Sequence, residues 1–64
     1  MGNQADYFRQ KAAALKANRR ALMTNARVAR ELCAPDALQR CLDTARVFSD
    51  MRRQALKDLR RALA

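Results

Sequence analysis

Basic side chains recur along residues 9–30, RQKAAALKANRRALMTNARVAR, among alanines and leucines. Guanidinium and ammonium groups bind phosphates and carboxylates through charge-assisted hydrogen bonds, so this stretch predicts a surface for an anionic partner. Two kinds of partner fit it: the phosphate backbone of RNA or DNA, and an acidic protein surface. The candidates for contact with a nucleic-acid backbone are Arg9, Lys16, Arg20 and Arg27. A row of charges also fits an ordinary solvated helix face, and that interpretation stays open.

The whole chain is strongly basic. Its 64 residues hold 14 Lys and Arg against 6 Asp and Glu, which gives a net charge of +8 and an isoelectric point of about 11.1. Such an excess attracts polyanions and speeds encounter with acidic partners, but it does not specify a fold. GC-rich coding also enriches arginine and alanine, so the charge alone does not identify the partner.

Residues that could carry catalysis or hold a metal ion are missing. The chain has no histidine and only two cysteines, too few ligands for a structural zinc site. It has no glycine-rich loop and no nucleophile with a nearby base. We therefore predict a protein that is not an enzyme and that uses no cofactor and no metal.

Two long helices account for the chain. Apolar residues repeat at alternating spacings of three and four over about residues 4–33 and again over about 37–63. A turn at about 34–36 separates them, and so short a connection joins antiparallel neighbours. We predict one all-α domain, residues 1–64, folded as a helical hairpin with helices about 40–45 Å long.

Local signals mark the helix ends. Asn3 followed by Asp6 predicts the start of the first helix. Asp36 followed by Gln39 resembles a capping box for the second helix. An earlier start, with Pro35 as the first helical residue, fits nearly as well.

The apolar repeat forms a coiled-coil-like seam between the helices. Alanine fills many of its positions, which should let the two backbones approach closely. The larger side chains predicted for the core and the dimer are Phe8, Leu15, Leu22, Leu38, Phe48 and Leu59. A 64-residue domain is marginally stable alone, and twofold homo-oligomers are common, so we predict a homodimeric four-helix bundle.

Apolar residues off the seam predict a further binding surface. Tyr7 on the first helix and Leu42 and Leu56 on the second lie outside the seam repeat. Either the dimer buries these positions or they anchor a helix of another protein. In the second interpretation Arg20, Arg27 and Arg30 form a basic rim that selects an acidic partner.

Two arginines interrupt the seam. Arg19 and Arg52 occupy seam positions near the middles of their helices, at nearly the same level of the hairpin. Two unpaired arginines are costly to bury together, so we expect both to extend from the seam edge towards Asp50 or Asp58. An anion-binding notch and a role in fixing the register are the alternatives.

Acidic residues accompany the basic row of the second helix. Asp43 precedes Arg46 by three residues, and Asp50 precedes Arg53 by three. Pairs at this spacing stabilise a helix by about 0.2–0.5 kcal/mol. We therefore expect the second helix to be largely self-neutralised and the first to carry the anion-binding surface.

The two cysteines flank the turn. Cys33 and Cys41 both fall on the packing side of the seam repeat, so we expect two buried thiols. Whether they form a disulfide stays open, because spacing alone does not establish the geometry.

The sequence resembles two groups of small helical proteins. Residues 31–45, ELCAPDALQRCLDTA, contain a cysteine, an acidic cap and then a leucine-containing helix, and this layout resembles the turn of the plasmid-encoded Rop family. That resemblance implies a hairpin that dimerises into a four-helix bundle. Rop proteins bind paired RNA but are acidic overall, so their RNA-binding residues are not transferred to this basic chain.

Residues 7–22, YFRQKAAALKANRRAL, are similar in kind to the short basic accessory proteins of phages and mobile elements. Some of these are anti-activators that hold a host transcription factor or motor ATPase inactive. This similarity implies a small regulator of an unidentified host protein.

The sequence thus favours a non-enzymatic, protein-binding regulator, and a nucleic-acid-binding hairpin dimer is the alternative. No apolar run is long enough to cross a membrane, and the first residues, MGNQADYF, lack the apolar core of a signal peptide. We therefore expect a cytoplasmic protein without membrane contact.

Overall fold

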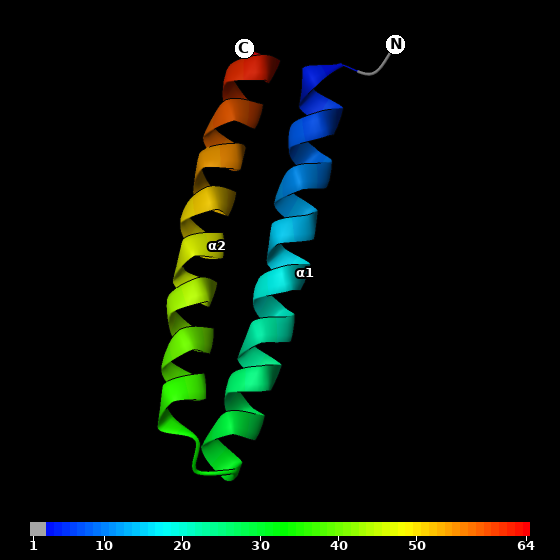
Figure 1. Cartoon of the computed structure of the whole chain (residues 1–64). Helices are drawn as coiled ribbons and strands as arrows, with labels where there is room; N and C mark the ends of the chain where they lie inside the picture. The colour runs from blue at the N-terminus through cyan, green and yellow to red at the C-terminus, as the bar shows by residue number, and fades with distance from the viewer. Residues whose placement is uncertain (1–2) are drawn as a thin grey trace.

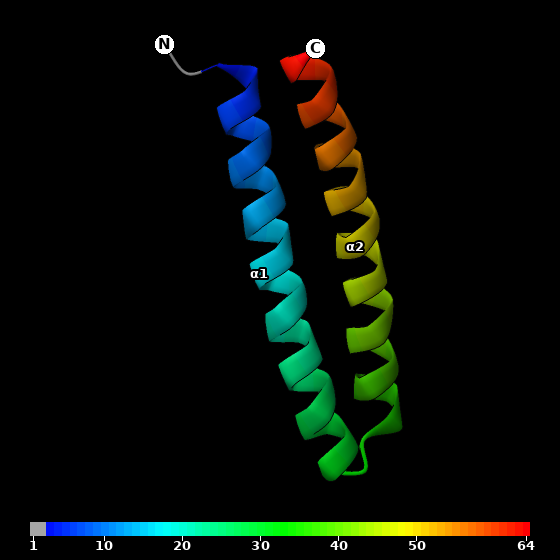
Figure 2. The same cartoon turned by 180° about the vertical axis from the view of Figure 1, so that it is seen from behind.

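Two helices packed side by side make up the computed structural model, which describes residues 3–64 (Figure 1). Helix α1 spans Gln4–Glu31 and helix α2 spans Pro35–Leu63. The termini lie together at one end, and the view from behind shows the same antiparallel pair (Figure 2). The predicted all-α hairpin is confirmed. Met1 and Gly2, part of the stretch from which we expect a cytoplasmic location, lie outside the described residues.

The start of α1 follows its sequence signal. Asn3 is the N-cap, and its Oδ1 accepts a hydrogen bond of 2.8 Å from the backbone amide of Asp6. Asp6 places a negative charge in the first turn, where the helix dipole favours it. It also accepts a hydrogen bond of 3.1 Å from Arg9 Nη1. The predicted cap is confirmed.

The turn departs from the prediction at both of its ends. Helix α1 ends at Glu31, two residues before the predicted end. Cys33 then adopts a left-handed conformation with φ of 54°. The Cys33 amide donates to the carbonyl of Arg30, and the Ala34 amide donates to that of Ala29. These two bonds form a Schellman motif, which satisfies carbonyls that the last helical turn leaves free.

Helix α2 begins at Pro35, without the predicted capping box. Ala34 is the N-cap and has no side-chain hydrogen bond to offer. Gln39 donates instead to the side chain of Asp43, 2.8 Å away. Proline is favoured at the first helical position because its φ is already helical and its missing amide would have had no partner there. The alternative start at Pro35 is therefore the one the chain adopts.

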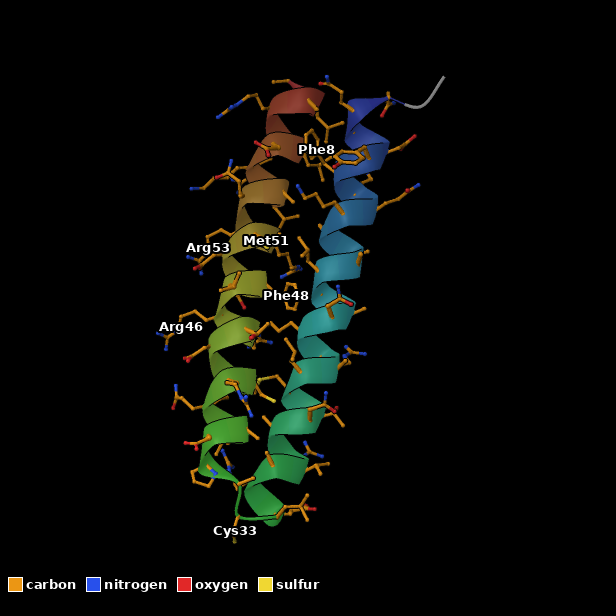
Figure 3. The ribbon with its side chains drawn as sticks, in the orientation of Figure 1. Phe8, Cys33, Arg46, Phe48, Met51 and Arg53 are labelled. Atoms are coloured by element: carbon orange, nitrogen blue, oxygen red, sulfur yellow. The ribbon has the colours of Figure 1, made fainter. Side chains whose placement is uncertain are left out.

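Small residues dominate the buried seam. The buried residues are Ala5, Ala12, Leu15, Ala26, Ala29, Ala45 and Ala55. Phe48 and Leu56 pack against the cluster of Ala12, Leu15 and Ala55, and Ala55 is only 1% exposed. Of the six predicted core residues, Leu15 is buried and the other five are partly buried. Phe8 and Phe48 lie between the helices, as Figure 3 shows.

The thiols do not share one environment. Cys33 is exposed and projects from the turn, whereas Cys41 is half-buried (Figure 3). The expectation that both thiols are buried is wrong for Cys33, because α1 ends before it and the left-handed turn redirects its side chain. Both cysteines are free in this structure.

Replacing Cys33 by glycine should stabilise the hairpin. The left-handed conformation costs an L-residue roughly 1–2 kcal/mol, and glycine avoids this cost but loses more conformational entropy on folding. We expect a net gain of about 0.5–1 kcal/mol, seen as a higher midpoint in thermal unfolding followed by circular dichroism under reducing conditions. Ala34→Gly is the matched control and should lower the midpoint, since Ala34 has a negative φ. A Cys33→Gly variant less stable than the parent would contradict the account of this turn.

Candidate functional site

Most basic residues gather on one flank of the hairpin, here called the cationic face. On α1 it consists of two seven-residue rows, residues 9, 16, 23 and 30 beside the seam and residues 6, 13, 20 and 27 outside them. On α2 the corresponding rows are residues 42, 49, 56 and 63 and residues 39, 46, 53 and 60. Rows on the same side of the seam face the same way in an antiparallel pair.

Ten of the fourteen basic residues belong to these rows or to the seam beside them. They are Arg9, Lys16, Arg19, Arg20, Arg27, Arg30, Arg46, Arg52, Arg53 and Arg60. The rows contain one acid, Asp6, which forms an ion pair with Arg9. The four candidates for nucleic-acid contact therefore lie together on this face, and all four are exposed.

A groove runs along the middle of the cationic face. One part of it is a hollow of about 320 Å³, bordered by the α1 side chains Lys16 and Arg19 and by a set of α2 side chains. That α2 set is Ser49, Arg52, Arg53 and Leu56. A second hollow continues the groove towards the turn, because it shares Arg19, Ser49 and Arg53 with the first and adds Met23 and Leu42.

Arg52 is the unusual member of this groove. Its Nε is buried and has no hydrogen-bond partner. Within residues 3–64, the Asp6–Arg9 contact is the one ion pair, so neither Arg19 nor Arg52 reaches Asp50 or Asp58 as expected. Asp58 accepts a hydrogen bond from Gln54 instead. The two seam arginines face the groove as unneutralised donors.

The second helix is not self-neutralised. Asp43 accepts a hydrogen bond from Gln39, and neither Arg46 nor Arg53 forms an ion pair with the acid three residues before it. Both arginines project from α2 on the side away from α1 (Figure 3). The expected Asp43–Arg46 and Asp50–Arg53 pairs are thus absent from the described residues. Both helices contribute cations to the face.

The opposite flank, here called the apolar face, holds a different set of side chains. Its exposed large apolar residues are Tyr7, Val28, Leu32, Val47 and Met51. The Tyr7 ring lies 5.2 Å from that of Phe8, and Lys11 Nζ lies 5.9 Å from the Tyr7 ring centroid. Tyr7, although 59% exposed, therefore belongs to a different surface from Leu42 and Leu56.

The proposed partner-binding set divides accordingly. Arg20, Arg27 and Arg30 share the cationic face with Leu42 and Leu56, and Tyr7 lies across the hairpin from them. The sequence pattern of each helix alone does not indicate that four further residues border the groove of this face: Met23, Arg46, Ser49 and Arg53. Superposing the seven-residue rows of both helices in antiparallel register would have found it.

Neither metal binding nor a membrane-spanning segment is supported by the described residues. Residues 3–64 bring together no group of three metal-ligating side chains. Neither α1 nor α2 has an apolar stretch long enough to cross a bilayer. The chemistry that the arrangement offers is recognition of anions beside apolar side chains.

Comparison with known proteins gave no relative from which a function could be transferred. No protein-family model, curated protein or solved structure matches the chain.

Replacing Arg52 by methionine should stabilise the free protein. The buried Nε has lost its hydration without gaining a partner, a cost of about 1–3 kcal/mol, and methionine keeps the packing of the aliphatic stem. We expect unfolding by urea to show a gain of about 1 kcal/mol. Arg53→Met, at an exposed position in the same groove, is the control and should change stability by about 0.5 kcal/mol or less. Equal effects of the two substitutions would mean that the Arg52 guanidinium carries no desolvation cost.

Proposed function

We propose that this chain is a small, non-enzymatic regulator that binds another protein through its cationic face. The observation that carries the proposal is the division of the hairpin into two unlike flanks, one with ten of the fourteen basic residues and one with five of the seven exposed large apolar residues. A basic groove with apolar side chains in it suits an acidic protein surface. Following the similarity to phage and mobile-element accessory proteins, the target is a host protein such as a transcription factor or motor ATPase. The chain would act as its inhibitor or anti-activator in the cytoplasm.

Apolar side chains within the cationic face favour a protein over a nucleic acid. Met23 is 40% exposed and Leu63 is 59% exposed, and both belong to rows of the cationic face. Leu42 and Leu56 are half-buried in the groove. A phosphate backbone offers no apolar counterpart to these side chains, whereas an amphipathic protein segment does.

Homodimerisation through the apolar face completes the proposal. The hairpin measures 47 × 17 × 11 Å, so each broad flank covers about 800 Å², the area that one partner contributes to a standard interface. The cationic faces repel each other more strongly than the apolar faces, which carry three cations, Lys11, Arg40 and Arg61, and one acid, Asp58. Joining two apolar faces gives the four-helix bundle predicted from the sequence and covers the side chains that a lone hairpin leaves exposed.

A single charge on the apolar face should dissociate the dimer. We expect the parent protein to elute with twice the 7.3 kDa chain mass in size-exclusion chromatography with light scattering. Val47→Glu should give the monomer mass at the same concentration, because it would bury an unpaired carboxylate in the interface. Gln10→Glu, which makes the same change of charge on the solvent side of α1, should leave the dimer intact. A Val47→Glu variant that stays dimeric would exclude this interface.

Binding to a nucleic-acid backbone is the second candidate function. The ten cations of the cationic face favour it, since phosphate contacts supply most non-specific affinity for RNA and DNA. The groove contains no aromatic side chain on which a base could stack, because Tyr7 lies on the apolar face. A hairpin dimer of this kind would therefore read shape and charge rather than sequence.

Neutralising part of the cationic face should decide between the two functions. The test variant changes Lys16, Arg20 and Arg27 to Gln, and the control changes Lys11, Arg40 and Lys57 to Gln, so both lose three charges. Because Lys11 and Arg40 lie on the apolar flank, light scattering first checks that the control is still dimeric. Each variant and the parent are immobilised, exposed to host lysate, washed, and then treated with nuclease. We expect the control to retain the partner as the parent does, and the test variant to retain about tenfold less, as three rim contacts of about 0.5 kcal/mol each predict.

Nuclease sensitivity separates the alternatives in that experiment. Release of all bound protein by the nuclease, together with salt-dependent binding of a duplex RNA by the purified parent, would establish the nucleic-acid function instead. Equal retention by the test variant and its control would remove the cationic face from either function.

A further inference from the structure

We infer that the groove of the cationic face is a docking site for one acidic amphipathic helix, which places a carboxylate between Arg19 and Arg52. This inference rests on the proposed function, since it names the partner chemistry that the cationic face would recognise. The occupant would lie along the hairpin as a third helix. Its contacts follow from the order of side chains in the groove, from the unpartnered donor at the centre and from the basic rims.

Apolar and polar side chains alternate along the groove. Met23 and Leu42 border the end nearer the turn, Arg19 and Ser49 lie at the centre, and Leu56 borders the far end. Residues 42, 49 and 56 are seven apart, so successive positions lie about 10.5 Å apart along α2. A docked helix with the same seven-residue repeat would place one residue opposite each of these positions. It therefore needs an apolar residue, then a polar one, then an apolar one at that spacing.

The central position requires an anion. The Arg52 Nε–H is buried without an acceptor, and the hollow that it borders is also lined by Lys16, Arg19 and Arg53, with no acid among its lining residues. Asp50 borders only the neighbouring hollow and forms no ion pair. A carboxylate accepts several hydrogen bonds, and with an arginine these are short and strong. A glutamate on the docked helix would supply the acceptor that Arg52 lacks.

The rims set the rest of the partner's composition. Arg46 and Arg53 border the groove on α2, and Arg20 and Arg27 belong to the outer α1 row of the same face. A helix lying between these rows gains from acidic residues on both sides of its apolar stripe. The occupant is thus an acidic helix of about 18 residues with the repeat Leu, Glu, Leu at seven-residue spacing, long enough to cover the roughly 21 Å between positions 42 and 56.

A synthetic peptide with that repeat and acidic flanks tests the inference directly. A fluorescein-labelled peptide is titrated with the parent protein, and a second peptide has its central Glu replaced by Gln. We expect the Gln peptide to bind about tenfold more weakly to the parent, because it loses a charge-assisted hydrogen bond to a buried donor. With Arg52→Met the difference should fall to about threefold, because the buried donor is gone and only the attraction of the other cations of the hollow remains. Arg40→Met, an exposed arginine outside the groove, should keep the tenfold difference.

This double comparison separates the specific carboxylate from general attraction. Equal binding of the Glu and Gln peptides by the parent would overturn the central contact. So would a difference between the two peptides that is as large with Arg52→Met as with the parent. Failure of the acidic peptide to bind while duplex RNA binds would overturn the helix as occupant. If the lysate partner is lost on neutralising the cationic face but the peptide does not bind, the docking mode is wrong and the proposed function stands. If neither effect is seen, both fail.

Discussion

The alanine-rich seam is the constraint on which the rest of the molecule depends. Small side chains at Ala12, Ala45 and Ala55 let two helices pack closely, but they leave little room between the backbones for anything larger. Phe8, Leu22 and Phe48 are therefore only partly covered, and the remaining large apolar side chains lie on the flanks. A hairpin built in this way has a small buried core and a large surface, which is why we propose that another copy of the chain covers one flank.

The two arginines in the seam give that surface its chemistry. Arg19 and Arg52 occupy positions where the seam repeat would otherwise place apolar residues, and both border the basic hollow at the middle of the hairpin. The buried Nε of Arg52 has no hydrogen-bond partner, so we expect it to reduce the stability of the free protein. Donors held without acceptors are typical of binding sites, where preorganisation for a ligand is maintained at the expense of the unliganded fold.

Much of this fold could be predicted from the sequence, and the failures have local causes. The seam repeat predicts both helices, and the Asn3 cap acts through one short hydrogen bond that neighbouring residues determine. The turn was mispredicted because two signals compete there: Pro35 is favoured as the first helical residue more strongly than Asp36 is as a cap, and Cys33 fills a left-handed position that usually belongs to glycine. The α1 cations of the cationic face could be predicted from the sequence, whereas the α2 cations were expected to be neutralised. The complete face is recognised only when α1 and α2 are placed side by side. The separation of Tyr7 from Leu42 has the same origin.

Charge determines how the two flanks can be used together. Ten cations on one face oppose any dimer that joins cationic faces, so a second copy would meet least repulsion on the apolar face, which holds three cations and one acid. In a twofold dimer formed there, the two cationic faces point away from each other and neither groove is covered.

The proposed dimer therefore presents two equivalent grooves on opposite sides. It would bind either one partner with two acidic helices or two copies of a partner with one. Two linked sites raise the overall affinity well above that of one groove when the partner can span both. A 64-residue chain with a shallow, solvent-exposed groove would in this way hold a much larger protein without a deep binding pocket.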